Sequence, residues 1–283
     1  MNRFFSFVLG LGLYLASTFC MVPADAGEPS FKRVIIVVLE NTNYNDALKQ
    51  PNFAKIANDG AVFTQFMAET HPSQPNYIAM IAGDTLGVKN DSPANLGANH
   101  IGNLLTSKSL NWKVYAEGLP SNCFLGTTSG RYARKHVPFI SFLNVQQNPV
   151  ECSKIVNSSQ FQNDVTNDQV PAFSMYIPNL DDDGHDTGAD YAGQWLSKEF
   201  GGVLSNSKFM KDTLIVITFD ESESSSAKNQ IYTVLIGANV TPRSKVDTLT
   251  NHYSVLRTIE DQFALGTLGK NDATALPIKG IWQ

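Results

Sequence analysis

The 283-residue chain is short of cysteine, of basic runs and of long apolar runs. It has three cysteines, and its charge is mildly negative, at −5, and dispersed. Without a basic face, neither a nucleic acid nor another polyanion surface is expected as a partner. The sequence also shows no internal repeat, low-complexity segment or linker, so we expect one globular domain, and a monomer.

The one long apolar run lies at the N-terminus. Residues 1–3 carry a positive charge, residues 4–19 are apolar, and Ala24–Ala26 fits a small-x-small cleavage site. This pattern predicts a secretory signal peptide over residues 1–26 and a mature chain of residues 27–283 that is secreted or periplasmic. No later stretch approaches the roughly 18 apolar residues that span a bilayer, so we expect no stable membrane anchor. An uncleaved N-terminal membrane helix is the alternative.

Two cysteines remain once Cys20 is assigned to the predicted signal. In an exported chain, Cys123 and Cys152 are expected to form a disulfide. Closing a loop of about 30 residues contributes roughly 3–4 kcal/mol in the chain-entropy description. The alternative is a catalytic thiol, although neither cysteine follows a predicted strand or begins a predicted helix.

Strand-like and helix-like segments alternate along the mature chain. Apolar β-branched runs predict strands at 34–39, 62–66, 113–116, 172–177, 214–219 and 231–236. Helices are expected at 52–59, 75–82, 101–108, 189–204 and 253–264. Such alternation indicates a single α/β domain whose mainly parallel sheet carries helices on both faces. The long connections 84–100 and 117–160 are typical of site walls or lids.

Two of the predicted strands end in oxygen-bearing side chains. Glu40 and Asn41 follow the strand at 34–39, and Asp220 and Glu221 follow the strand at 214–219. Ligands of such sheets bind at the carboxyl ends of the strands. Oxygen donors of this kind suit one divalent cation, Mg²⁺, Ca²⁺ or Mn²⁺ ahead of Zn²⁺. For either pair alone, a helix cap or a solvated turn is the alternative.

Ser73 lies between a strand and a helix, in the segment from Glu69 to Tyr77. Pro75 fits the first turn of the following helix, which places Ser73 at or just before the helix start. Backbone N–H groups and the helix dipole there stabilise an anion such as a phosphoryl group. Ser73 is therefore a candidate nucleophile that a metal could activate, and a plain N-cap is the alternative.

Histidines accompany these segments. His71 precedes Ser73 by two residues, His136 lies with Lys135 in a cationic patch that could bind phosphate, and His185 neighbours Asp186 in an acidic turn after the strand at 172–177. His252 precedes the last helix, where the dipole disfavours its protonated form, and a plain cap is the alternative. His100 is interpreted as structural.

Six motifs occur in order, each weak alone: Leu39-Glu40-Asn41-x-x-Tyr44, His71-Pro72-Ser73-x-Pro75-Asn76-Tyr77, Lys135-His136-x-Pro138-Phe139, Pro178-Asn179 with Asp183-Gly184-His185-Asp186, Phe219-Asp220-Glu221 and His252-Tyr253-Ser254. Together they resemble the phosphoesterase family of secreted bacterial acid phosphatases and phospholipases C, in the alkaline-phosphatase-like superfamily. The resemblance runs from about residue 33 to 265, nearly the whole mature chain.

The resemblance implies roles for these residues. The metal ligands would be Glu40, Asn41, Asp220 and Glu221. Ser73 would form a phosphoseryl intermediate, with His185, Asp186 and His252 as further catalytic groups. His71, Asn76, Lys135 and His136 would bind the substrate phosphate.

The function implied is a secreted, metal-dependent acid phosphatase. Its substrate would be a phosphorylated small molecule or a phosphoinositide. The chain lacks the longer motifs and the extra C-terminal domains of the phospholipase branch, which favours the monoesterase branch. The alternatives are a phosphodiesterase of phospholipase C type and a secreted binding protein without turnover.

Overall fold

The computed structural model describes Met1, residues 27–223 and residues 228–283. Apart from Met1, the predicted signal peptide lies outside the described residues. Within those ranges, none of the helices combines the length and the apolar character that crossing a bilayer requires.

An eight-stranded sheet forms the centre of the molecule, in the order β11-β2-β10-β9-β1-β8-β4-β7. Only β10 runs antiparallel to its neighbours in this sheet, so the predicted mainly parallel sheet is confirmed. The strands are β1 Arg33–Leu39, β2 Ala61–Phe63, β4 Trp112–Ala116, β7 Ile155–Asn157, β8 Phe173–Ile177, β9 Thr213–Phe219, β10 Thr233–Gly237 and β11 Ser244–Val246.

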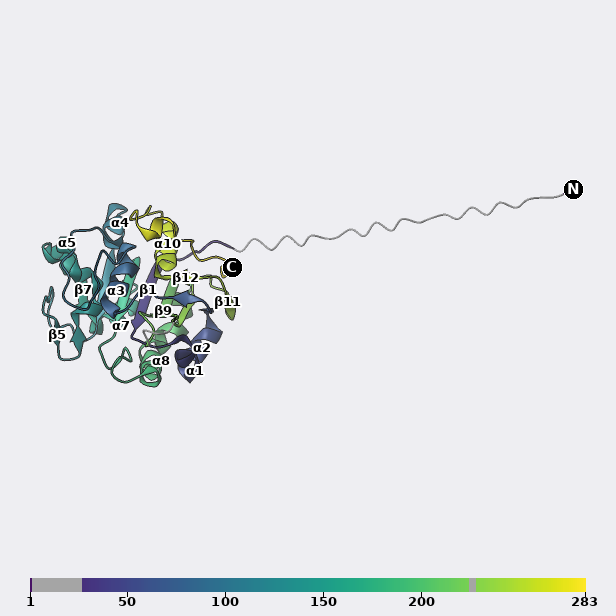
Figure 1. The fold of residues 1–283 in the computed structure, drawn as a ribbon, viewed down its shortest axis with the longest axis horizontal. Coiled ribbons are helices and arrows are strands. Elements are labelled where there is room, and N and C mark those ends of the chain that lie inside the picture. Colours follow the sequence, from purple (N-terminus) through teal and green to yellow (C-terminus); the bar gives the residue numbers. More distant parts are fainter. Residues whose placement is uncertain (2–26, 224–227) are drawn as a thin grey trace.

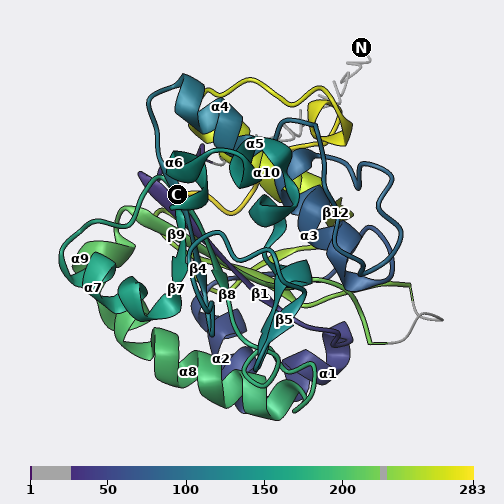
Figure 2. The same cartoon turned by 90° about the vertical axis from the view of Figure 1, so that its left-hand side faces the viewer.

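Helices cover both faces of the sheet, as Figures 1 and 2 show. One layer holds α3 Ser73–Ala82, α4 Ile101–Ser107, α5 Leu143–Gln146, α6 Pro149–Cys152 and α10 His252–Gln262. The other holds α1 Tyr44–Lys49, α2 Pro51–Asp59, α7 Phe161–Thr166, α8 Ala189–Ser205 and α9 Ser207–Met210. Because both faces are covered, all seven residues of β9 are buried, which explains its unbroken apolar run.

The five predicted helices correspond to α2, α3, α4, α8 and α10, with ends shifted by one or two residues. The segment expected as one strand at 62–66 is instead β2 and the separate β3 Phe66–Met67, because Thr64 and Gln65 turn toward Asp247. The prediction missed the short strands β7 and β11 of the central sheet and the short helices α1, α5, α6, α7 and α9. It also missed β5 Thr128–Ser129, β6 Tyr132–Ala133, β12 Thr250–Asn251 and the 3₁₀ helices Arg134–His136, Pro138–Ser141, Ser158–Gln160 and Asn271–Ala273.

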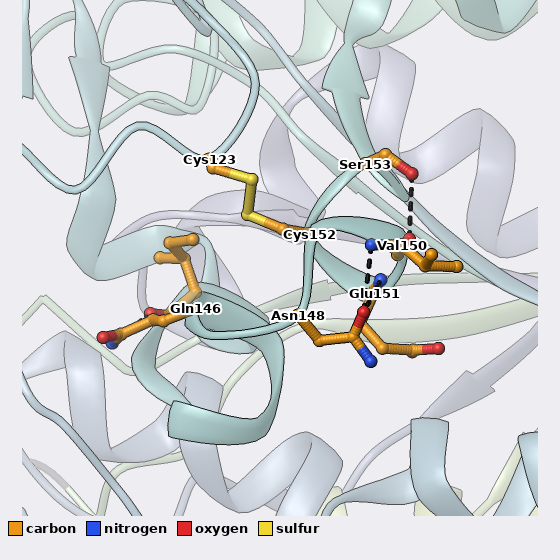
Figure 3. The surroundings of a disulfide bond; sticks show 8 residues. Cys123, Gln146, Asn148, Val150, Glu151, Cys152 and Ser153 are labelled. Carbon is orange, nitrogen blue, oxygen red and sulfur yellow. Dashed lines mark hydrogen bonds between the residues drawn. A yellow bond between two sulfur atoms is a disulfide. The ribbon is translucent and has the colours of Figure 1, made fainter.

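A disulfide joins Cys123 to Cys152, as predicted, with Cα atoms 5.4 Å apart. Figure 3 shows it connecting the long loop after β4 to the end of α6, whose first turn is capped by Asn148. The bridge closes a separation of 29 residues within the predicted 117–160 connection. The disulfide therefore fastens two parts of this connection to each other.

Candidate active site

The carboxyl ends of β8, β1 and β9 lie side by side at one edge of the sheet. Leu39 of β1 pairs in register with Phe219 of β9, so Glu40 and Asp220 leave their strands as neighbours. The Asp220 N–H donates to the Leu39 carbonyl at 2.9 Å, and the Glu40 N–H donates to the Asp183 carbonyl at 3.0 Å. Residues distant in sequence thereby meet in one buried cluster.

Asn41 turns the chain out of β1. Its φ of 47° lies in the left-handed region, which asparagine tolerates better than most residues. The Asn41 N–H donates to Asp220 Oδ1 at 3.1 Å, which holds the turn against the end of β9. The predicted ligand set Glu40, Asn41, Asp220 and Glu221 is thus brought together.

Ser73 is the first residue of α3, and Pro72 holds the N-cap position without a side-chain cap. The Ser73 hydroxyl is buried and donates to Glu40 Oε2 at 2.9 Å, with Glu221 Oε1 at 3.2 Å. The hydroxyl therefore faces the carboxylates rather than the backbone N–H groups of its own helix. The capping alternative for Ser73 is not what the structure shows.

Burial and mutual repulsion act on these acids together. Burial, with Asp220 next in effect, raises the pKa of Glu40 from 4.5 to about 8. Burial followed by Glu221 raises the pKa of Asp220 well above its ordinary range, and burial followed by Glu40 raises the pKa of Glu221 to about 7. Burial and repulsion therefore outweigh the stabilisation that neighbouring donors and cations give to negative charge in this cluster.

The donor set fits a hard divalent cation. Asp220 Oδ2 is buried without a hydrogen-bond donor, whereas Glu221 Oε2 pairs with His71 Nδ1. The end of the Asn41 amide that faces the cluster lies 3.0 Å from Glu40 Oε2 and 3.2 Å from Asp220 Oδ1. As the nitrogen it donates to both carboxyls, and as the oxygen it would be a further ligand for a cation. Across the described residues, however, no three His, Cys, Asp or Glu side chains are spaced as a metal site. The metal therefore stays a prediction.

Tyr77 and His136 form a buried layer against Glu40. The Tyr77 hydroxyl donates to Glu40 Oε1 at 2.5 Å, and its ring stacks on His136 with centroids 5.1 Å apart. His136 Nε2 lies 3.2 Å from Glu40 Oε1, and Nδ1 lies 3.5 Å from Asp183 Oδ2. Burial lowers the pKa of His136 to about 4. The structure thus places this predicted phosphate ligand beside a carboxylate, with its ring only 1% exposed.

Two other histidines keep contact with solvent. His71 pairs through Nδ1 with Glu221 Oε2, and 28% of its side chain is exposed. His185 pairs through Nδ1 with Asp186 Oδ1 at 2.6 Å, and 36% of its side chain is exposed. Asp186 also pairs with Arg131, which anchors it from a second loop. The predicted His185–Asp186 pair is therefore formed on the loop that follows β8.

His252 and Asn76 lie behind the site. His252 is buried against Phe66, with Nε2 3.1 Å from the Asp220 carbonyl, and burial lowers its pKa to about 4. The Asn76 amide accepts from the Glu69 and Thr70 N–H groups and donates to two carbonyls, those of Thr70 and Pro72. Both side chains hold the site's backbone in place, and the structure does not bring them to the cluster with Ser73.

Lys135 reaches the start of α3 through a residue that the sequence analysis did not single out. Its Nζ lies 3.0 Å from Asp91 Oδ2, and the Gln74 N–H donates to Asp91 Oδ1 at 3.0 Å. Burial alone lowers the pKa of Lys135, but nearby carboxylates, Glu40 first, outweigh it and leave the pKa raised. Asp91 carries no local signal, since its contacts with Gln74 and Lys135 come from segments that are distant in sequence.

A groove of about 600 Å³ lies between α2, α8, α9 and the end of β10. Because β10 is antiparallel to its neighbours, its carboxyl end lies at the edge of the sheet opposite to Ser73, and the groove lies at that edge. It is lined by none of the residues described above. The chemistry of the side chains, rather than the size of a hollow, therefore locates the candidate active site.

The fold resembles that of solved structures. A Vibrio parahaemolyticus protein in the alkaline phosphatase superfamily superimposes with a TM-score of 0.59 at 15% identity, covering 89% of this chain and 72% of that one. At this identity the likeness shows the fold alone. It confirms the predicted alkaline-phosphatase-like α/β architecture.

Sequence comparison gives closer relatives. A probable acid phosphatase of Kluyveromyces lactis is 36% identical over 266 residues, covering 90% of this chain and 63% of that protein. A phosphatidylinositol-3-phosphatase of Mycobacterium tuberculosis is 38% identical over 264 residues, covering 92% and 85%. The chain spans less than two thirds of the length of the fungal acid phosphatases that it matches. The Phosphoesterase family matches residues 42–266, and the chain therefore belongs to the Phosphoesterase family.

Proposed function

We propose that the chain is an exported, metal-dependent phosphomonoesterase that works through a phosphoserine intermediate. The observation that carries this proposal is the Ser73 hydroxyl, held 2.9 Å from Glu40 Oε2 at the first residue of α3. The names of its relatives, acid phosphatases and a phosphatidylinositol-3-phosphatase, support the same reaction class.

In the first half-reaction, Ser73 Oγ forms a bond to phosphorus and the bond from phosphorus to the leaving oxygen breaks. The hydroxyl proton leaves along the hydrogen bonds that Ser73 makes to Glu40 and Glu221. The Glu40 and Glu221 oxygens lie 2.9 and 3.2 Å from the hydroxyl, so one of these carboxylates takes up that proton. Tyr77 fixes Glu40 by donating to its other oxygen.

A divalent cation would be held by Glu40, Asn41, Asp220 and Glu221, where it would offset the negative charge on the phosphoryl oxygens. The leaving oxygen must gain a proton. Among His71, His136, His185 and His252, only the side chains of His71 and His185 are more than a quarter exposed. We assign this step to His185, because Asp186 holds Nδ1 and leaves Nε2 for the leaving group.

In the second half-reaction, water forms a bond to phosphorus and the bond to Ser73 Oγ breaks, which releases phosphate, and the proton taken up by the carboxylates returns to Ser73 Oγ. His185 returns as a base for this water, since it gave up its proton in the first step. The substrate class proposed is a phosphorylated small molecule or a phosphoinositide. Export rests on the signal-like residues 1–26.

Ser73→Ala tests the nucleophile. We expect turnover of an aryl phosphate to fall by at least about a thousandfold, because no other group can form the covalent intermediate. Far-UV circular dichroism and the melting temperature should stay near those of the wild type, and acid quenching of the wild type should trap phosphate on the peptide that contains Ser73. Near-normal turnover by a folded variant would overturn the proposal.

Parallel assays of a phosphate monoester and a diester separate the phosphatase from a phosphodiesterase.

A further inference from the structure

The loop 84–100 is fastened to the first turn of α3 by a single residue, Gln74. The Gln74 N–H donates to Asp91 Oδ1 at 3.0 Å. The Gln74 side chain, 1% exposed, donates through Nε2 to the carbonyls of Asn90 at 2.8 Å and Ser92 at 2.6 Å. The residue next to Ser73 therefore binds three consecutive residues of the loop, and Asp91 is held from both sides.

The first turn of α3 has few backbone donors. Pro72 and Pro75 lack an N–H group, so the N-cap and the first three helical positions offer only the N–H groups of Ser73 and Gln74. Asp91 accepts the second of these, and a carboxylate is favourable at the positive end of a helix. Asp91 thus caps the ten-residue helix of Ser73 from another segment of the chain.

The second oxygen of Asp91 holds a cation. Asp91 Oδ2 accepts from Lys135 Nζ at 3.0 Å, and the two side chains are 33% and 21% exposed. Lys135 directly precedes His136, whose ring lies 3.2 Å from Glu40 Oε1. Asp91 is therefore the bridge between the turn that carries Ser73 and the ammonium group of Lys135.

We propose that Asp91 is a positioning residue that holds the Lys135 ammonium group beside the first turn of α3, where it binds an oxygen of the phosphoryl group that Ser73 attacks. The proposal rests on the proposed phosphatase function and extends it to a residue outside the predicted site. Asp91 acts through Lys135 and Gln74. It does not itself contact the substrate, because like charges repel.

Asp91→Asn separates the two contacts of this residue. The amide oxygen can still accept from the Gln74 N–H, but the charge that faces Lys135 is lost. We expect KM for an aryl phosphate and the inhibition constant of inorganic phosphate to rise together, roughly 5–20-fold, as for loss of a charge-assisted contact. The kcat should stay within about threefold, because the Gln74 N–H keeps its acceptor and the first turn of α3 stays capped. Asp91→Ala removes both contacts and should lower kcat further.

Asp84→Asn is the matched control, since it neutralises a carboxylate of the same loop that bonds Leu86 and Asn271. It should leave KM and phosphate inhibition unchanged.

The double variant that combines Asp91→Asn with Lys135→Met decides whether Asp91 acts through Lys135. Adding Asp91→Asn to Lys135→Met should raise KM no further, because the partner of Asp91 is gone. Three outcomes would show that the positioning role is wrong. The first is that the increases in KM from the two substitutions multiply, and the second is that Asp91→Asn has the same KM as the control. The third is that Asp91→Asn lowers KM, because Asp91 had occupied the phosphate position.

Isothermal titration with inorganic phosphate keeps this inference apart from the proposed function. If the wild-type chain turns over no phosphate ester, the proposed function fails. A weaker phosphate affinity in Asp91→Asn, absent in the Lys135→Met background, would still establish the positioning role. Equal affinity in wild type and Asp91→Asn would overturn the role whatever the turnover.

Discussion

Glu260 is a buried carboxyl far from the candidate active site, on the inner face of α10. It faces Asp272, whose two oxygens accept from the Leu268 and Lys270 N–H groups. Burial first, and Asp272 next, raise the pKa of Glu260 from 4.5 to about 9. The folded chain therefore keeps Glu260 protonated between pH 4.5 and about 9, where the unfolded chain releases the proton.

Glu260→Gln tests this linkage. Between pH 4.5 and 9 the folded wild type binds the extra proton, so its free energy of unfolding should decrease as pH rises, by at most about 1.4 kcal/mol per pH unit. Below pH 4.5 both states are protonated and the loss vanishes. Glutamine can still donate to Asp272 without titrating, so its stability should decline less. Urea unfolding from pH 5 to 9 measures both slopes, and parallel slopes would contradict the linkage.

The residues of the site differ in how far the sequence could predict them. Glu40 and Asp220 follow apolar runs, and Ser73 precedes a helix, so local pattern is enough to select them. Asp91 has no such pattern, because its partners Gln74 and Lys135 lie 17 and 44 residues away. His136 and Asn76 lie in the expected motifs, yet burial gives them contacts that no motif specifies.

At the scale of elements, the stability of α3 depends on the residues at its C-terminal end as well as on those of its first turn. It ends at Gly83, whose φ of 69° is strained for any residue with a Cβ. A Cβ there would lie 2.3 Å from Asp272 Oδ1. The end of the helix that carries Ser73 is therefore closed by the C-terminal segment, through the same aspartate that faces Glu260.

Gly83→Ala should destabilise the protein by about 2 kcal/mol or more, because it adds backbone strain and displaces Asp272. Gly202→Ala is the matched control: it lies inside α8, and a Cβ there meets nothing within 4 Å. It should be neutral or stabilise by up to about 1 kcal/mol, as alanine favours helices. Urea midpoints compare the two, and equal effects would refute the role of Gly83.

Element prediction succeeded where the periodic or apolar signal was long. The segments of β1, β9, α8 and α10 are long enough that a single residue out of pattern does not hide the apolar or helical period. It failed for α1, α5, α6, α7 and α9, which have four to six residues each, too few for a helical period to emerge. Such short helices depend on capping and packing against the rest of the domain.

At the scale of the whole molecule, a cation in the candidate site would link strands that are about 180 residues apart in sequence. It would bind the folded state alone, because the unfolded chain separates Glu40 from Asp220. Ligand linkage then stabilises the fold by about 2.7 kcal/mol at a hundredfold excess over Kd. The effect can be measured without any substrate.

We expect Mg²⁺, Mn²⁺ or Ca²⁺ to raise the melting temperature of the wild type and a chelator to reverse the rise. Asp220→Asn should show a much smaller rise, since it removes a ligand charge from the cluster. Asp212→Asn provides the control, because Asp212 lies at the opposite end of β9 and pairs with Lys32 at the surface. An equal rise in all three proteins, or none in the wild type, would refute a cation at this site.

The sequence by itself determined the class of the fold, the order of its main elements and the chemical type of the site, because hydrophobic pattern and terminal carboxylates are local properties. Only the tertiary structure decided which of these groups meet. The register of Leu39 with Phe219 places Glu40 beside Asp220, and the loop 84–100 brings Asp91 to Ser73's helix. Such contacts join distant segments through packing and hydrogen bonds of the folded chain, and no short stretch of residues encodes them alone.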